Sequence, residues 1–243
     1  MTDGPPINDY LTALKAASAF DGQVVYHREF VPSEPTFGET RKPWPEPIGR
    51  LLDAMGIDRL YDHQAKTIDR VRAGIHTVAA TQTASGKTLA YALPVFEAVI
   101  EDASACALFI YPLKALAQDQ LKAINRMSTH LPEVNLRADI YDGDTSAYRR
   151  KKIRDKPPHI LMTNPEMIHL SVLPYHDRWT DLLSRLRFVV VDEVHTYRGI
   201  MGSHMAQVFR RLQRICSHYG AAPTFVFTSA TVANPDELAT QLT

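Results

Sequence analysis

The sequence predicts an α/β fold built on a doubly wound, largely parallel sheet. From residue 48 onward, short apolar runs alternate with segments of helical periodicity. Most of these runs are nearly continuous apolar stretches, which strands covered on both faces require. Repeated alternation of strand and helix leads to right-handed crossovers and a parallel sheet. The expected strands are residues 76–80, 106–111, 135–141, 159–163, 188–191 and 224–228.

The segments between these strands are expected to be helices. The last long segment carries apolar residues at helical spacing over 205–216, and Gly220 is placed to end it. A further helix is expected to begin at Asn234, a few residues before the last residue, so we expect the chain to be a fragment of a longer protein. The expected helices between the strands are residues 62–73, 87–100, 114–128, 146–154, 165–170 and 202–219.

The first part of the chain differs from the rest in composition. Seven of the 16 prolines fall in the first 47 residues, where each one removes a backbone donor and fixes φ. We expect residues 1–46 to form an N-terminal extension packed on the core, and residues 47–243 to form one domain. A partly disordered leader is the alternative for the first segment.

Composition excludes several classes of protein. The chain has 27 Lys and Arg against 27 Asp and Glu, so it lacks a uniformly basic surface, although a local basic groove stays open. Two cysteines are too few for a disulfide scaffold or a four-cysteine zinc site, and we expect reduced, buried thiols. No apolar run approaches the ~20 residues of a membrane span, so no membrane partner is expected. We expect a location in the cytoplasm with the nucleoid if the source is prokaryotic, and in the nucleus if it is eukaryotic.

Residues 81–88, Thr-Gln-Thr-Ala-Ser-Gly-Lys-Thr, follow an expected strand and open an expected helix. Small residues let backbone N–H groups approach a triphosphate, and the helix N-terminus adds positive potential. Lys87 is expected to reach the β- and γ-phosphates, and the Thr88 hydroxyl to ligate Mg²⁺. Thr81 replaces the first glycine of the usual P-loop pattern. The expected nucleotide contacts in this loop are Thr83, Ala84, Ser85, Gly86, Lys87 and Thr88.

An apolar strand ends in Asp192, Glu193, Val194 and His195. Carboxylates at the C-terminal end of a parallel strand lie at the ligand-binding edge of the sheet. Asp192 is expected to hold Mg²⁺, and Glu193 to orient and deprotonate the attacking water. The alternative, a solvated turn with two acids, is disfavoured by the P-loop upstream.

Three further segments carry residues that could act at the same nucleotide site or on a bound strand. Gln64 has an amide that can donate to and accept from one adenine edge. Thr228, Ser229 and Thr231 end the last strand, where their hydroxyls can bridge the acidic motif and a bound strand. Pro112 and Lys114 also follow a strand and open a helix, which makes them candidates for phosphate contact. Each segment is weak alone, but their order along the chain is informative.

In this order the motifs resemble those of the first RecA-like lobe of superfamily-2 helicases, from about residue 48 to residue 243. Segments 83–88, 111–120, 141–145 and 195–204 look like those of the DNA-repair helicases typified by mitomycin repair factor A and its fungal Hrq relatives. The resemblance implies a P-loop NTPase fold, ATP and Mg²⁺ as cofactors, and DNA-stimulated hydrolysis with 3′-to-5′ translocation. It also implies DNA and a second RecA-like lobe, absent from this chain, as partners.

The resemblance further assigns roles to single residues. His195 would link the acidic motif to Ser229 and Thr231 and so pass the nucleotide state to the DNA groove. Without a second lobe, the chain is expected to be nearly inactive in hydrolysis. The residues expected to contact DNA are Pro112, Lys114, Asp142, Gly143, Asp144, Thr145, Thr163, Asn164 and Pro165.

Two alternative functions and one undecided segment remain. The first alternative is an RNA helicase of the related Asp-Glu-x-Asp type, and the second is a non-catalytic RecA-like module that binds DNA or a partner. The basic run at residues 149–156 is either a solvated helix face or a surface that attracts the DNA backbone.

Overall fold

The computed structural model describes residues 7–20, 23, 26, 34–81, 85–230 and 234–243. The chain divides into two compact units, residues 1–35 and 36–243. The first unit contains helix α1 (Ile7–Ala16) and the short 3₁₀ helix η1 (Ser18–Phe20). No residue of α1 is buried, so the helix exposes its apolar side chains, Ile7 and Tyr10 among them.

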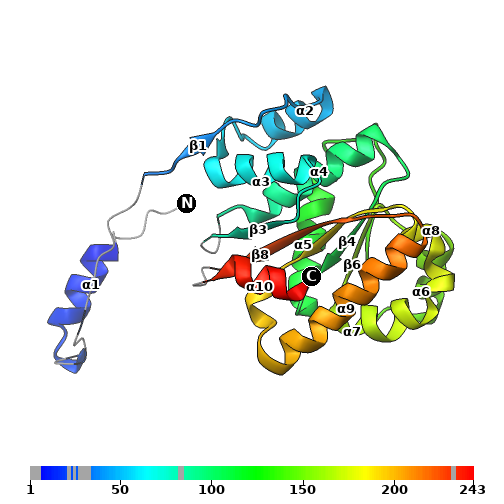
Figure 1. The fold of residues 1–243 in the computed structure, drawn as a ribbon. Helices are drawn as coiled ribbons and strands as arrows, with labels where there is room; N and C mark the ends of the chain where they lie inside the picture. Colours follow the sequence, from blue (N-terminus) through cyan, green and yellow to red (C-terminus); the bar gives the residue numbers. More distant parts are fainter. Residues whose placement is uncertain (1–6, 21–22, 24–25, 27–33, 82–84, 231–233) are drawn as a thin grey trace. The chain divides into compact units, whose positions relative to one another are not determined.

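The second unit is built on a six-stranded sheet in which every neighbouring pair is parallel. The strand order is β3-β8-β7-β4-β6-β5 (Figure 1). The expected α/β class is therefore confirmed, with all six expected strands present. Their bounds are β3 (Thr77–Ala80), β4 (Cys106–Ile110), β5 (Ala138–Tyr141), β6 (Ile160–Thr163), β7 (Leu186–Val191) and β8 (Thr224–Ser229).

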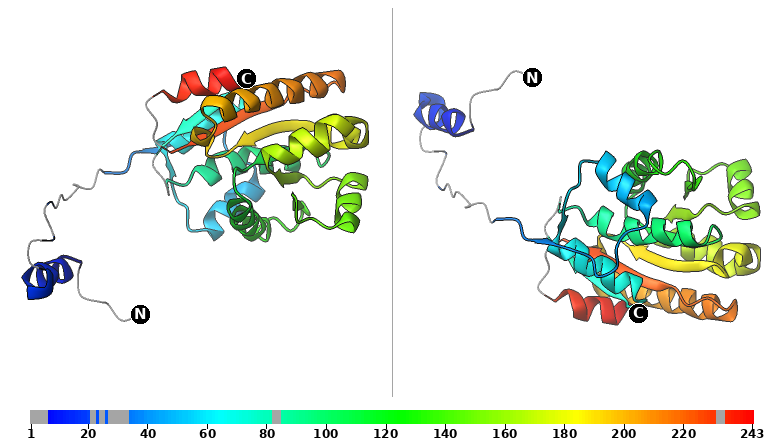
Figure 2. Two further views of the ribbon diagram at one scale, coloured as in Figure 1. Left: turned by 90° about the horizontal axis from the view of Figure 1, so that it is seen from below. Right: turned by 90° about the horizontal axis from the view of Figure 1, so that it is seen from above.

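Helices cover both faces of the sheet (Figure 2). One face packs against α2 (Glu46–Ala54), α3 (Asp62–Arg72), α4 (Lys87–Glu101) and α5 (Lys114–Ser128). The other face packs against α6 (Ala147–Asp155), α7 (Pro165–Met167), α8 (Thr180–Leu183), α9 (Gly199–His218) and α10 (Pro235–Leu242). Side chains alternate between the two cores along each strand, as Phe109 and Ile110 of β4 do, and this explains the continuous apolar runs.

The segment between β6 and β7 differs from the expected helix at residues 165–170. Helix α7 ends at Met167 and is followed by the π-helix η2 (Ile168–Val172) and the 3₁₀ helix η3 (Leu173–Trp179). Pro174 lacks a backbone donor, which favours a change of helix type at this point. Trp179 is buried, and its indole donates to the carbonyl of Ser171 (3.1 Å), so the turns pack as a compact unit.

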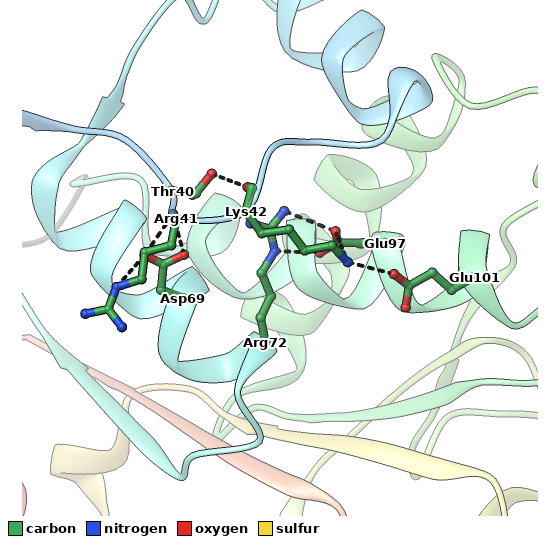
Figure 3. A network of polar contacts seen from close by, with 7 residues as sticks. All are labelled: Thr40, Arg41, Lys42, Asp69, Arg72, Glu97 and Glu101. Carbon is green, nitrogen blue, oxygen red and sulfur yellow. Dashed lines mark hydrogen bonds and ion pairs between the residues drawn. The ribbon is translucent and has the colours of Figure 1, made fainter.

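Residues 37–44 lie along α3 and α4 and are bonded to both helices. Strand β1 (Phe37–Gly38) pairs with β2 (Leu60–Tyr61), and the Arg41 N–H donates to the Asp69 carboxylate. Farther along, Arg72 bonds both Glu97 and the carbonyl of Lys42 (Figure 3). The expected extension, residues 1–46, therefore crosses the boundary between the two units, and its packing as a whole stays a prediction.

Across the described ranges, none of the helices combines the length and the apolar character that a membrane crossing demands.

Candidate functional site

The C-terminal ends of six parallel strands meet at one edge of the sheet, and the sequence motifs gather there. Each strand is followed directly by a candidate segment. These segments begin at Thr81 after β3, Pro112 after β4, Asp142 after β5, Asn164 after β6, Asp192 after β7 and Ala230 after β8.

The P-loop joins β3 to α4. Gly86 has a positive φ of 75° directly before the helix, a backbone conformation that glycine adopts at little cost. The Lys87 ammonium donates to the Thr81 carbonyl (2.8 Å), and the Thr81 and Ser85 hydroxyls are 2.6 Å apart. These contacts connect the two ends of the loop to each other. Thr83 and Ala84, both expected to contact nucleotide, lie outside the described residues.

Gln64 is buried at the start of α3 and bonds to backbone at both ends of its amide. Its Oε1 accepts from the Tyr61 N–H (2.9 Å), and its Nε2 donates to the Gly86 carbonyl (3.0 Å). In this state Gln64 connects α3 to the P-loop, so adenine would have to share or displace these bonds. The rings of Phe37, Tyr61 and His63 stack beside it, with centroids 5.5 and 5.7 Å apart.

The acidic motif follows β7. Asp192 is nearly buried, and its Oδ1 accepts from the Glu193 N–H (3.0 Å) and from the Thr228 hydroxyl. Glu193 has a left-handed backbone with φ of 51°, which is uncommon for a residue with a side chain. Such strain persists only where the surrounding structure holds it in place, and it is concentrated at functional sites.

His195 lies between the acidic motif and the end of β8. Its Nδ1 is 3.1 Å from Glu193 Oε2 and 3.3 Å from the Ser229 hydroxyl. The Ser229 carbonyl in turn accepts from the Thr81 N–H at 3.3 Å. A continuous set of contacts therefore joins the P-loop, the last strand and the acidic motif. Thr231, the other expected coupling residue, lies outside the described residues.

The donor set around Thr88 and Asp192 fits Mg²⁺ better than zinc. Among the described residues, no group of three or more His, Cys, Asp and Glu is placed to hold a metal ion. Mg²⁺ needs no such cage, because one or two protein oxygens plus phosphates and water complete its octahedron. The Thr88 hydroxyl donates to the amide oxygen of Gln120 (3.1 Å), and the described hydrogen bonds to Asp192 fall on Oδ1.

The expected DNA-contact loops use several of their side chains internally. Asp142 is buried, and its Oδ1 accepts from the backbone N–H groups of Asp144 and Thr145, both at 3.0 Å. The Thr163 hydroxyl, also buried, donates to the Tyr141 carbonyl (2.6 Å). These side chains hold the loops in shape, so the loop backbone is the better source of contacts to a strand.

Other expected contacts lie at the surface or at a helix start. The Lys114 ammonium is 2.8 Å from Asp144 Oδ2, and this hydrogen bond raises the pKa of Lys114. Asn164 accepts from the Met167 N–H (2.9 Å) and so caps the helix that Pro165 begins. Pro112 is half-buried just after β4. Nothing in these positions assigns a bound strand, so the nucleic-acid contacts stay predictions.

A match to a family model identifies the family to which this fold belongs. The model of the DEAD/DEAH box helicase matches residues 61–238. The chain belongs to this family. Family membership implies nucleotide binding.

Individual relatives agree with this assignment. The chain is 47% identical over 214 residues to the uncharacterized ATP-dependent helicase YprA of Bacillus subtilis, covering 86% of this chain and 28% of that protein. It is 36% identical over 234 residues to the ATP-dependent helicase hrq1 of Schizosaccharomyces pombe, covering 94% of this chain and 22% of that protein. The chain therefore spans about a quarter of the length of these relatives.

The crystal structure of the DUF1998 helicase MrfA bound to DNA and AMPPNP superposes on the chain with a TM-score of 0.89. The two are 43% identical, and the match covers 97% of this chain and 32% of that one. The expected RecA-like fold is confirmed, as is the resemblance to superfamily-2 helicases of the mitomycin repair factor A and Hrq group.

Three side chains at this edge lie in segments that the sequence singled out, but their individual partners come from the structure. Thr228 bonds Asp192, Gln120 bonds Thr88, and Arg150 donates to the carbonyls of Asp142, Gly143 and Thr145. Thr228 and Gln120 stand inside or beside the quoted motifs. Only their partners in three dimensions reveal what they do, so the sequence carries no separate signal for them.

Proposed function

We propose that the chain is the ATP-binding motor lobe of a DNA helicase or translocase, acting in DNA repair and moving 3′-to-5′. The observation that supports this most strongly is the continuous set of contacts from Lys87 through Thr81, Ser229 and His195 to Glu193. It brings a phosphate-binding cation, a candidate base and a candidate coupling residue to one edge of the sheet.

In this proposal the P-loop and Lys87 bind the phosphates of ATP. The ammonium would exchange its bond to the Thr81 carbonyl for phosphate oxygens, because both are acceptors within its reach. Bound Mg²⁺, held by the Thr88 hydroxyl and the Asp192 carboxylate, would neutralise charge on the phosphates. Gln64 would contact adenine and would connect it to the P-loop through the hydrogen bond to the Gly86 carbonyl.

Glu193 would orient and deprotonate the attacking water. Its backbone is left-handed, and its Oε2 is buried beside the His195 ring. His195, 3.1 Å from the same oxygen, would sense the charge there and pass the change to Ser229.

DNA is proposed as the polymer because one of the similar solved structures is that of MrfA bound to DNA. The loops after β4, β5 and β6 would contact the backbone of one strand, with Lys114 as the charged contact. A second RecA-like lobe of the intact protein would supply an arginine to the transferring phosphate, which is worth roughly 10³–10⁵ in rate. The 243-residue chain alone should bind nucleotide weakly and hydrolyse it very slowly.

Glu193→Gln in the intact protein tests this function. DNA-stimulated ATP hydrolysis should fall by roughly 10²–10⁴, the usual contribution of a positioned base, while ATP binding persists. Glu133→Gln, at an exposed glutamate that pairs with Arg50, is the matched control and should leave the rate unchanged. Unaltered hydrolysis in Glu193→Gln would mean that this lobe does not carry out the reaction, and would favour the non-catalytic module. Stronger stimulation by RNA than by DNA of the same sequence would favour the RNA helicase.

A further inference from the structure

We propose that Gln120 is a positioning residue for the magnesium ion of the bound nucleotide. Its amide oxygen accepts the hydrogen of the Thr88 hydroxyl and thereby leaves the lone pairs of that hydroxyl available to a metal ion. This inference rests on the proposed function and deepens it, since it concerns how the same site selects Mg²⁺-bound ATP.

The geometry supplies the first step. The Thr88 hydroxyl donates to Gln120 Oε1 over 3.1 Å. A hydroxyl has one donor and two acceptor lone pairs, and its hydrogen rotates to suit its neighbours. A threonine in the first turn of a helix can instead turn its hydroxyl toward nearby backbone groups. By accepting the hydrogen, Gln120 keeps the Thr88 hydroxyl turned away from these backbone groups and leaves its oxygen free to act as a metal ligand.

The orientation of the Gln120 amide is fixed in turn. Tyr91 lies three residues after Thr88 on α4, so the two side chains share one face of that helix. The Tyr91 hydroxyl donates to the same Oε1 at 3.5 Å and lies 3.3 Å from the Tyr111 hydroxyl. Gln120 Oε1 thus accepts from both hydroxyls of this face of α4.

The two tyrosines are suited to remain donors. Tyr91 and Tyr111 are each at most 1% exposed. Burial raises the pKa of both hydroxyls, and the nearby negative charge of Asp192 raises it further. They stay protonated at any physiological pH. Thr88 and Tyr91 can therefore both donate to Gln120 Oε1 without bound metal.

Gln120 is placed to orient Thr88, the expected metal ligand, without binding the metal itself. Groups that orient metal ligands through hydrogen bonds typically change metal affinity by 10- to 100-fold when they are mutated. The Thr88 hydroxyl is a neutral ligand whose lone-pair direction depends on where its hydrogen points. The loss of its acceptor should therefore affect metal-bound nucleotide and spare metal-free nucleotide.

The test measures ATP binding to the intact protein that contains this chain by calorimetry, once with excess Mg²⁺ and once with EDTA. The variants are Gln120→Leu, which removes the acceptor, and Gln120→Glu, which keeps an acceptor oxygen. Gln118→Leu, at an exposed glutamine of the same helix, is the matched control. In Gln120→Leu the gain in affinity on adding Mg²⁺ should shrink on the order of tenfold. Gln120→Glu and Gln118→Leu should keep that gain, and affinity in EDTA should be equal in all four proteins.

Each other outcome has a defined meaning. An unchanged Mg²⁺-dependent gain in Gln120→Leu overturns the inference while leaving the proposed function intact. An equal loss with and without Mg²⁺ also overturns it, because the defect then lies in the nucleotide pocket. A wild-type protein that binds no ATP refutes the proposed function and this inference together. If Gln120→Leu does not fold by circular dichroism, Tyr91→Phe takes its place: a loss confined to Mg²⁺ supports the inference, and no loss overturns it.

Discussion

Replacing Glu97 with glutamine should destabilise the fold more than any exposed charge change on the same helix. Glu97 lies in the middle of α4, with its side chain 4% exposed, and meets Arg72, whose side chain is 10% exposed. The two form a bidentate pair, Nε to Oε2 at 2.6 Å and Nη2 to Oε1 at 3.1 Å. Glutamine keeps the shape and removes the charge.

The magnitude follows from the burial of this pair. Breaking a buried ion pair by removing one partner costs about 3–5 kcal/mol, because the other charge is left uncompensated. Here the guanidinium keeps its bond to the Lys42 carbonyl (2.8 Å) and its place over the Trp44 ring (3.9 Å). The loss should therefore fall at the lower end, about 3 kcal/mol. In a domain of this size, that corresponds to a decrease in Tm of about 6–12 °C.

Urea and thermal unfolding, followed by circular dichroism, measure the effect. Glu101→Gln is the matched control, since Glu101 is half exposed on the same helix and pairs with Lys42 at the surface. It should change stability little, as exposed pairs do. A Glu97→Gln loss as small as that of the control would refute the reasoning. So would a double mutant with Arg72→Met in which the two effects simply add, because residues that interact should couple.

Three further predictions concern other parts of the core. Gly202→Ala should destabilise by about 1–3 kcal/mol in urea unfolding, because a Cβ there would lie 2.6 Å from the Tyr197 carbonyl; an unchanged midpoint would contradict this. Burial and the charge of Arg137 lower the pKa of His159, so its contribution to the free energy of unfolding should be full above pH 6.5 and decline as the pH falls below that value. Urea unfolding measured from pH 7 to pH 5 should show a smaller decline in His159→Gln than in the wild type. Burial raises the pKa of the Cys106 thiol to about 11, so iodoacetamide should modify it at pH 8 only after unfolding, as mass spectrometry of native and denatured chain would show.

The parallel sheet could be predicted from sequence because its strands are buried on both faces. That burial produces continuous apolar runs in the sequence, and strands β4 and β7 lie at two of these runs. The expected start of β5 at residue 135 was wrong by three residues. Asn135 has a positive φ of 46°, which places it in a turn, and pairing begins at Ala138.

Helix α2 was not predicted, since the prolines around it indicated extended chain. Pro47 lies in the first turn, where a missing N–H costs nothing, and Pro45 stands just before the helix. The two-residue strands β1 and β2 are too short to carry a periodic signal. Their pairing depends on long-range contacts that no local pattern encodes.

The candidate site could also be predicted only in part. The positions of Lys87 and Asp192 could be predicted, because a residue that follows a parallel strand must lie at the binding edge. The partners of the buried polar groups could not, since Gln64, Asp142 and Thr163 bond to backbone groups distant in sequence or hidden in a loop. Side-chain chemistry predicts what a residue can bond, whereas only the fold decides which bond it makes.

The strand order separates the two proposed tasks of this lobe in space. β3, β8 and β7 adjoin one another and precede the candidate nucleotide residues, whereas β4, β6 and β5 adjoin one another and precede the candidate polymer loops. Only the border between β7 and β4 belongs to both halves. Gln120 and Tyr111 follow β4 and still contact Thr88 and Tyr91, so the β4 segment serves both tasks. Substitutions in the loops after β5 and β6 should therefore alter polymer binding with little effect on hydrolysis.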